Sequence, residues 1–341
     1  MKKQIILPLL ILALVLGGCA SPEPVQSRYS ATFLTLFDTV TTVIGMVDSE
    51  EAFEAQAQQV HDSLEFYHQL FDIYHDYSGI SNLKTVNDNA GIAPVKVDRA
   101  IIDLLNDCRT YYDLTGGKVN VAMGSVLRLW HNARNDSVDN PANAYLPDAA
   151  ALSEANLHCG WDTVVIDEAA GTVYLSDPEQ LLDVGAIAKG WATQRVAREL
   201  PAGLLISVGG NVCSTGPKGG DGSPWVVGVT DPDGGSNYLH TLYLSRGSVV
   251  TSGDSQRYYT VNGENYHHII DPETLYPSAY WRSVTILCDD SGLADALSTA
   301  LFVLPLEDGQ ALLDQCGAEA MWVDGEGNFF YSPGFQEYIK T

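Results

Sequence analysis

The apolar positions of this chain follow a helical period in some segments and a strand period in others. From Glu51 to about His75 the apolar residues recur every three or four positions, as Val60, Leu64, Tyr67, Phe71 and Tyr74. This period predicts an amphipathic helix. Further helices are predicted over residues 98–114, from Ala186 onward, and from Gly292 to Leu304, where four leucines form one apolar stripe.

Short β-branched runs punctuated by Gly, Pro and Asp predict strands joined by turns. They are TVVID near 163, TVYLS near 172, LLISV near 204, WVVGV near 225, SVVTS near 248 and SVTIL near 283. Helices and clustered strands without regular βαβ alternation predict an α+β fold, with mixed and antiparallel sheets packed against helices. No linker divides residues 29–341, so we expect a single domain there.

The first residues have the pattern of a secretory leader. Lys2 and Lys3 precede an apolar run of about a dozen residues, shorter than the roughly 20 that a transmembrane helix requires. LGGC at 16–19 is similar to a bacterial lipobox, which makes Cys19 a lipid-carrying residue. We therefore expect a signal peptide over 1–18, an anchored linker over 19–28, and a location on the extracytoplasmic face of a bacterial membrane; a transmembrane segment is the alternative.

The chain is strongly acidic, with 18 basic and 43 acidic residues among 341 and a formal net charge of −25. This charge argues against nucleic acid as a partner. Beyond Cys19 there are five cysteines without CxxC spacing, which indicates neither a disulfide framework nor a zinc site. We expect buried apolar thiols instead.

Two segments have residues suited to phosphate and metal chemistry. In LDVGAIAKGWA, 182–192, a strand breaks at Gly185 before a helix whose first turn contains Lys189, and such a helix start attracts phosphate. In GLADALSTALFVL, 292–304, Asp295 and Thr299 are four residues apart on one helical face, and their oxygens suit Mg²⁺. An ordinary surface lysine and a helix cap are the alternatives.

Two other segments are weaker candidates. NYHHIIDPETLYP, 265–277, contains adjacent histidines, of which one could act as an acid or base near neutral pH, although adjacent strand residues face opposite sides. SVGGNVCSTG, 207–216, could bring backbone close to a ligand or simply form a turn. No GxGxxG, Walker-type or GxSxG pattern occurs, which counts against Rossmann, P-loop and α/β-hydrolase sites.

Taken in order, five blocks resemble the motifs of the ApbE family of FAD:protein FMN transferases. They are LDVGAIAKGWA, ISVGGNV, VVTSGDSQRY, HHIIDPETLYP and ADALSTALFVL, and the segments at 71–91 and 119–130 resemble earlier blocks of the family. The resemblance implies binding of FAD and Mg²⁺-dependent transfer of its FMN half to a threonine hydroxyl of a partner protein, with release of AMP. The implied acceptor is a protein of an extracytoplasmic redox system.

The resemblance also implies roles for individual residues. The implied metal ligands are the Ala186 carbonyl, Asp295 and Thr299, and the implied catalytic residues are His268, Asp295 and Lys189. The implied FAD contacts are Tyr74, Asn87, Lys118, Val119, Asn120, Asp183, Lys189, Arg257 and Ile270. His268, which matches the HIIDP block, is the candidate base for the threonine hydroxyl, and His267 is the less favoured neighbour.

Three positions depart from the family pattern, of which the first is Phe37 in place of a usual Met. Asn120 replaces a frequent Asp, and Leu275 replaces the glycine of the DPxTG turn, so we expect this turn to differ in shape because leucine disfavours positive φ. The same site could use water as acceptor, as a Mg²⁺-dependent FAD pyrophosphatase giving FMN and AMP. It could also bind FAD without turnover, as a non-catalytic lipoprotein.

Overall fold

The computed structural model describes residues 26–235 and 237–341, so the predicted leader and the lipobox cysteine lie outside the described residues. The helices are α1 (Glu50–Phe71), α2 (Leu83–Asp88), α3 (Arg99–Leu114), α4 (Gly124–Asp139), α5 (Ala149–Asn156), α6 (Ala188–Arg198), α7 (Ser291–Phe302) and α8 (Leu306–Cys316). None of the helices in this part of the chain is both long enough and apolar enough to cross a membrane.

An eight-stranded sheet organises the molecule, in the order β1-β2-β6-β7-β10-β13-β14-β15. Every described pair in it is antiparallel, and Val249 of β10 lies opposite Leu287 of β13. Its strands are β1 (Ser27–Leu34), β2 (Val40–Val47), β6 (Leu204–Val208), β7 (Asn211–Ser214), β10 (Gly247–Gly253), β13 (Ser283–Cys288), β14 (Glu319–Val323) and β15 (Phe329–Tyr331). β1 begins inside the residues expected to form the linker.

Three smaller antiparallel sheets complete the strand content. They are β3-β5-β4, formed by Val95–Lys96, Thr172–Leu175 and Val164–Asp167; β8-β9, formed by Trp225–Thr230 and Tyr238–Leu244; and β11-β12, formed by Tyr258–Val261 and Glu264–His267. The α+β class is therefore confirmed, and all the described strand pairs are antiparallel.

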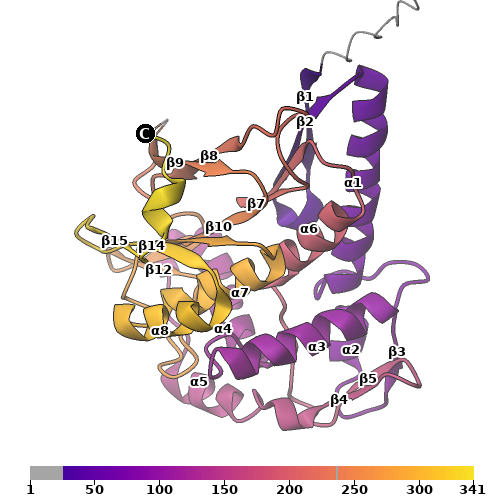
Figure 1. The fold of residues 1–341 in the computed structure, drawn as a ribbon. Coiled ribbons are helices and arrows are strands. Elements are labelled where there is room, and N and C mark those ends of the chain that lie inside the picture. Colours follow the sequence, from indigo (N-terminus) through magenta and orange to yellow (C-terminus); the bar gives the residue numbers. More distant parts are fainter. Residues whose placement is uncertain (1–25, 236) are drawn as a thin grey trace, which may run out of the picture.

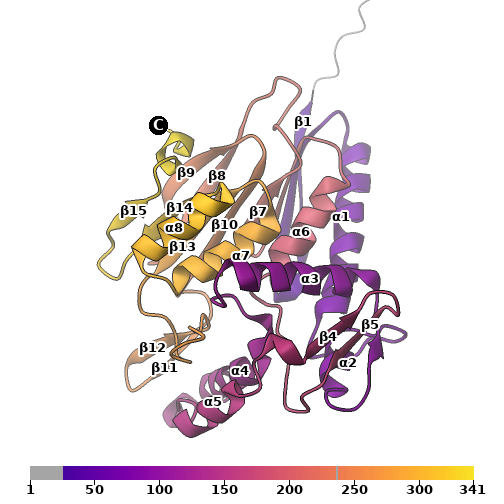
Figure 2. The ribbon, with the colours of Figure 1, turned by 60° about the horizontal axis from the view of Figure 1, so that its bottom comes forward.

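The core has two parts, one on each face of the large sheet. Helices α1, α6 and α7 cover one face, as Figures 1 and 2 show, and bury the larger apolar cluster, which includes Leu64, Ile206 and Leu297. β8 and β9 cover the other face, where Phe335 is fully buried. The stripe of leucines in α7 faces the sheet as the period predicted, because Leu297 and Leu301 have no exposed surface.

The cysteines are free thiols in the described part of the chain. Cys108, Cys159 and Cys213 are buried, as expected, whereas Cys288 and Cys316 are only partly buried. Burial raises the pKa of the Cys159 thiol to about 11 and that of Cys213 to about 12. At neutral pH both are uncharged apolar groups, and neither has the low pKa of a reactive cysteine.

Candidate active site at the start of α6

The close approach of α6 and α7 depends on a glycine in the first turn of α6. A Cβ added to Gly190 would lie 2.2 Å from the Ser291 carbonyl oxygen and 2.6 Å from the Asp295 Cβ. Only glycine leaves room for this contact. The KGW part of the LDVGAIAKGWA block therefore brings the start of α6 directly onto α7.

Asp295 lies at this contact and is 4% exposed. Its Oδ2 accepts a hydrogen bond of 2.8 Å from the Gly190 amide and lies 3.8 Å from Lys189 Nζ. Burial raises the pKa of the Asp295 carboxyl, while the charge of Lys189 and the Gly190 amide oppose that rise. The structure thus brings the predicted Lys189 and Asp295 together, although 105 residues separate Asp295 from Gly190.

The Ala186 carbonyl has lost its usual helical partner. In a regular α-helix the amide of Gly190 would donate to Ala186 O, but here it donates to Asp295, and no other backbone amide in the described chain donates to Ala186 O. Thr299 follows Asp295 by one turn of α7, and its hydroxyl makes no hydrogen bond within the described residues. A carboxylate, a free carbonyl and a free hydroxyl are the oxygen ligands that Mg²⁺ prefers, so the predicted ligand set fits the metal.

Asp183 lies just before this turn and is held from several directions. Its backbone amide donates to Val121 O over 2.8 Å, and its Oδ1 accepts from the Gly185 amide over 2.9 Å. Burial raises the pKa of its carboxyl, and Gly185, His131, Arg257 and Lys189 oppose the rise. The charges of Lys189 and Arg257 thus favour the ionised form of Asp183, against the effect of burial.

Asn87, a predicted FAD contact, uses both ends of its amide on the backbone of Leu182. Its Oδ1 accepts from Leu182 N over 2.8 Å, and its Nδ2 donates to Leu182 O over 2.9 Å. These bonds fix the chain immediately before Asp183. In this arrangement Asn87 positions the site, and its direct contact with FAD stays a prediction.

The predicted loop 118–120 lines a cavity of about 370 Å³. Lys118 Nζ lies 2.7 Å from Glu273 and 3.6 Å from Asp271, while Val119 is buried. The Asn120 side chain donates to Cys159 O and accepts from the Ala122 amide. The side chains of this loop are thus occupied within the protein.

The structure separates the roles of the adjacent histidines. His267 Nε2 lies 2.8 Å from Ser278 O, and His267 Nδ1 lies 3.2 Å from the Ile269 amide. A neutral imidazole with Nε2–H donating and Nδ1 accepting satisfies both contacts, so His267 is a structural residue. His268 is exposed to solvent, and the Arg257 backbone is the hydrogen-bonding neighbour of its ring.

His268 lies in a strongly positive environment. Burial, followed by the charge of Arg257 and, more weakly, that of Lys189, lowers the pKa of His268 to about 3. His268 is therefore neutral at pH 7 and able to accept a proton.

The remaining predicted residues border the same region. Arg257 is exposed and forms no ion pair within the described residues, and Ile270 is buried under the β11-β12 hairpin with Leu275. Leu275 has a φ of +63°, which lies in the left-handed region that leucine disfavours; whether the turn differs from that of the family stays a prediction. The Leu275 carbonyl accepts a hydrogen bond from buried Trp130 Nε1, and its side chain packs in a cluster, which together hold this conformation.

Tyr74 lies in the loop after α1, where a buried carboxylate holds the backbone. Asp72 Oδ1 accepts from the amides of Tyr74 and His75, over 2.6 and 3.1 Å, and Asp72 Oδ2 accepts from Tyr77 over 2.8 Å. The predicted α1 extended to His75, but the helix ends at Phe71 because this loop begins with Asp72. In the sequence, the signal for this role of Asp72 is its position directly after the last apolar residue of the helix.

Asn211 is another residue that sequence patterns did not single out. It is 2% exposed, follows the two glycines of SVGGNV, and lowers the pKa of Asp295 from its neighbouring position. Its Nδ2 has no hydrogen-bond partner in the described chain. The Asn211 amide thus acts on Asp295 as a hydrogen-bond donor does, although Nδ2 lies outside ordinary hydrogen-bond geometry, and a small movement would let it donate to Asp295 or to a group bound beside it.

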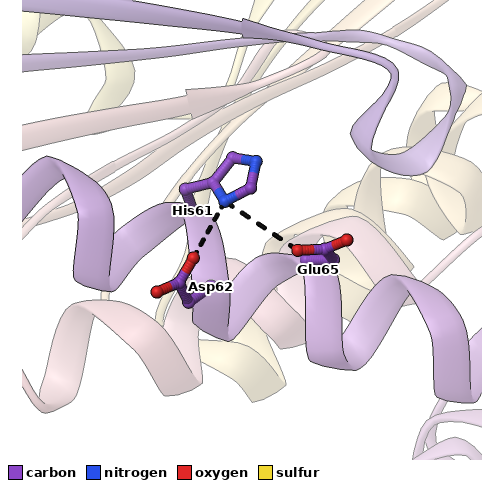
Figure 3. A group of neighbouring side chains, drawn as sticks. All are labelled: His61, Asp62 and Glu65. Atoms are coloured by element: carbon purple, nitrogen blue, oxygen red, sulfur yellow. Dashed lines mark hydrogen bonds and ion pairs between the residues drawn. The ribbon is translucent and has the colours of Figure 1, made fainter.

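A different group on α1 has metal-ligand side chains but lies apart from this arrangement. Figure 3 shows His61 Nδ1 pointing to Asp62 Oδ1, at 3.0 Å, and to Glu65 Oε2, at 4.0 Å. Both carboxylates are largely exposed, and the helical spacing alone brings the three side chains together. We infer no metal site from them.

The described geometry agrees with the comparison against known families. The model of the ApbE family matches residues 34–322. This chain belongs to the ApbE family. The match includes every residue predicted for the site, and it confirms the resemblance that the ordered sequence blocks indicated.

Individual ApbE relatives extend the match. A FAD:protein FMN transferase of Treponema pallidum is 35% identical over 280 residues, which cover 76% of this chain and 75% of the relative. One of Klebsiella pneumoniae is 32% identical, covering 77% and 79%. The crystal structure of an ApbE protein from Thermotoga maritima superposes with a TM-score of 0.80 at 28% identity, covering 92% of this chain and all of the other. The flavin transferase ApbE of Vibrio cholerae, with a TM-score of 0.74 at 23% identity, shares the fold.

Proposed function

We propose that this chain is a Mg²⁺-dependent FAD:protein FMN transferase that joins FMN to a threonine hydroxyl of a partner protein and releases AMP. Relatives named FAD:protein FMN transferase support the transfer of FMN from FAD to a protein. The observation that carries it is the exchange of hydrogen bonds at the start of α6, where Gly190 donates to Asp295 and leaves Ala186 O free. That exchange leaves the Ala186 carbonyl free at the start of α6, where Lys189 lies 3.8 Å from Asp295.

The reaction exchanges the phosphoanhydride bond between the two halves of FAD for a phosphoester bond to threonine. The threonine Oγ forms a bond to the phosphorus of the FMN half, and the bond from that phosphorus to the oxygen bridging it to AMP breaks. The electron pair of the broken bond leaves with AMP, and the hydroxyl proton passes to a base. Such transfers depend mainly on positioning and on neutralising charge, rather than on covalent chemistry by the protein.

The residues of this chain suit these tasks. Lys189, the amide-rich start of α6 and Arg257 supply positive charge for the diphosphate, and Asn211 offers a buried donor. Asp183, fixed by the Gly185 amide, suits a polar group of FAD. Ala186 O, Asp295 and Thr299 would hold Mg²⁺, which as a Lewis acid supplies charge stabilisation on the phosphate oxygens.

His268 is suited to receive the hydroxyl proton. Its neutral imidazole has a lowered pKa partly because Arg257 and Lys189 are positive. A bound diphosphate would compensate those charges and raise the pKa of His268 toward the value of a useful base. The proton acceptor would thereby improve only when the flavin substrate is in place.

We propose further that the enzyme is anchored by lipid on Cys19 at the extracytoplasmic face of a bacterial membrane. The basic residues, apolar run and LGGC sequence of the leader support this location. The test compares the full chain with its Cys19→Ser variant in a bacterial host. The natural chain is expected in the membrane fraction with lipid mass on its N-terminal peptide, and an unmodified Cys19 would contradict the proposal.

The activity is tested with the purified chain, FAD, Mg²⁺ and a library of peptides that each contain one threonine. Mass spectrometry follows AMP and the mass of each peptide, and matched peptides with valine in place of threonine are the control. The expected result is AMP together with a peptide that has gained FMN less water. An Asp295→Ala variant is expected to lose both products.

The alternative functions give different products. AMP and free FMN without any labelled peptide would identify a pyrophosphatase that uses water. Bound FAD that stays intact with every peptide would identify a binding protein. Either result would refute the transferase.

A further inference from the structure

Helix α4 presents a polar group to the predicted flavin site that no part of the proposed mechanism uses. His131, Arg134 and Asn135 are at positions i, i+3 and i+4, so they share one face of the helix. The buried face of α4 contains Trp130 and Ala133, and α4 packs beside α5 and β11. Figure 2 shows α4 and α5 below the large sheet, on the same side as β11 and β12.

His131 contacts Tyr74, a residue 57 positions earlier in the chain. The two rings are stacked, with centroids 5.1 Å apart and an angle of 24° between their planes. Tyr74 Oη lies 3.5 Å from His131 Nδ1, at the long limit of a hydrogen bond. Because Asp72 holds the Tyr74 backbone, His131 determines where the ring of Tyr74 lies.

The neighbours of His131 determine which of its nitrogens holds the proton. Arg134 Nη2 donates to Asn135 Oδ1 over 3.3 Å, which turns the amide so that its Nδ2 lies 2.8 Å from His131 Nε2. Burial and the charges of Arg134 and Arg257 lower the pKa of His131, so its imidazole is neutral at pH 7. A neutral imidazole that accepts at Nε2 has its proton on Nδ1, the atom facing Tyr74.

The Tyr74 hydroxyl is therefore an acceptor toward His131 and still has its own proton to donate. Burial, followed by the charge of Asp183, raises the pKa of Tyr74 to about 12, so the proton stays at neutral pH. The side chain of Tyr74 is 47% exposed, which leaves the hydroxyl accessible to a ligand. Tyr74 thus offers a directed O–H donor at the site.

The charge around this donor selects an anion. Arg134 is partly buried and makes no ion pair with a carboxylate in the described residues, and burial and the nearby Arg257 lower the pKa of Arg134. The two arginines act on Tyr74 together with the carboxylates Asp183 and Asp38, and neither arginine forms an ion pair within the described residues. A phosphate group has both the charge and the acceptor oxygens that this arrangement lacks.

We propose that His131 is a positioning residue that, supported by Asn135, holds the Tyr74 hydroxyl as a donor to a phosphate oxygen of FAD, with Arg134 and Arg257 as counter-charge. This inference rests on the proposed function, because the contact of Tyr74 with FAD comes from the family resemblance. It adds a helix to the site from which no binding residue was predicted.

The test is a double-mutant cycle on the full chain, with His131→Phe, Tyr74→Phe and both together. The phenylalanine at 131 keeps a ring for stacking and removes the Nδ1–H donor. Binding of FAD with Mg²⁺ is measured by flavin fluorescence, and steady-state transfer is measured in parallel. Each single variant is expected to weaken FAD binding about five- to tenfold, the effect of one hydrogen bond, and the double variant no more than Tyr74→Phe.

Two further variants separate positioning from folding. His131→Asn places an amide donor near the position of Nδ1 and is expected to recover most of the affinity, whereas Asn132→Ala, on an exposed position of the same helix, is expected to change nothing. The rise in KM should exceed the fall in kcat. Unchanged binding in His131→Phe, or effects of His131→Phe and Tyr74→Phe that simply add, would overturn the proposal.

A measurement without flavin distinguishes this inference from the proposed function. Nitrogen NMR of the histidine-labelled chain reports the tautomer of His131, for which Nδ1–H is expected. An Nε2–H tautomer would overturn the proposed role of His131 in holding the Tyr74 hydroxyl, whatever transfer activity the chain shows. An Nδ1–H tautomer in a chain that binds no FAD would instead refute the proposed function, and with it phosphate of FAD as the ligand.

Discussion

Replacing Gly190 by alanine has two opposing effects on the free energy of unfolding. Alanine favours the helical conformation, but its Cβ does not fit between α6 and α7. In an exposed helix, alanine is favoured over glycine by about 1 kcal/mol. At this position the new Cβ would lie 2.2 Å from the Ser291 carbonyl oxygen, where real Cβ atoms do not come below 3.0 Å. Backbone forms that contact, so α6 and α7 must separate by roughly 0.8 Å or more in a core that is packed like a solid.

The separation has a cost that can be worked out. Overpacking of a core costs about 1 to 3 kcal/mol. The same movement stretches the 2.8 Å bond between Gly190 N and Asp295 Oδ2, and a hydrogen bond to a charged group contributes about 1.5 to 3 kcal/mol. After the gain in propensity, the expected loss in free energy of unfolding is about 2 to 5 kcal/mol.

Urea unfolding measures this loss, and FAD binding with and without Mg²⁺ measures the damage to the site. Gly325→Ala is the control, because an added Cβ there meets no atom within 4 Å. We expect Gly190→Ala to lose stability and Mg²⁺-dependent FAD binding together, while the control keeps both. A Gly190→Ala protein as stable as the natural chain would refute the packing of α6 on α7 described above.

Three other substitutions give testable results. Leu275→Gly should lower the free energy of unfolding by about 2 to 3 kcal/mol in urea unfolding, because the lost buried side chain outweighs the relief of positive φ; a gain in stability would contradict this. Asn87→Leu should cost about 2 to 3 kcal/mol by the same assay, since it leaves both polar groups of Leu182 unpaired, and an unchanged midpoint would show that water replaces them. The folded-state pKa of His268 is lowered from 6.5 to about 3, so between these pH values the unfolded chain binds a proton that the folded chain does not. The free energy of unfolding is therefore highest above pH 6.5 and falls as the pH drops toward 3. Stability of His268→Ala, measured across that pH range, should therefore fall less steeply than that of the natural chain, and equal slopes would refute the lowered pKa.

Features that depend on local spacing could be predicted from the sequence. The apolar period before residue 72 predicted α1, and the interval from Asp295 to Thr299 predicted two oxygens on one face of α7. A helix or strand repeats over short distances, so its period is visible in a few consecutive residues. The family motifs likewise consist of short blocks whose order can be read directly.

Features that depend on contacts across the chain could not be predicted. Asp295 accepts a hydrogen bond from the Gly190 amide, 105 positions away, and Tyr74 stacks on His131, 57 positions away. No local sequence pattern encodes either contact. Helix α4 itself was missed, although Val126, Trp130, Ala133 and Ser137 have helical spacing, because the segment is mostly polar. The eight-stranded order also needs pairings such as β2 with β6, which are distant in sequence.

Because the chain is strongly acidic, the basic residues that form no ion pair near Tyr74 are informative about the ligand. In a protein with 43 acidic and 18 basic residues, many cations are held in ion pairs, such as Arg282 with Asp254 and Lys118 with Glu273. Arg134 and Arg257 have no such partner in the described residues, and both influence the same groups around Tyr74. Two neighbouring arginines that form no ion pair of their own retain binding energy for an anionic substrate, at the cost of repulsion between them in the free enzyme.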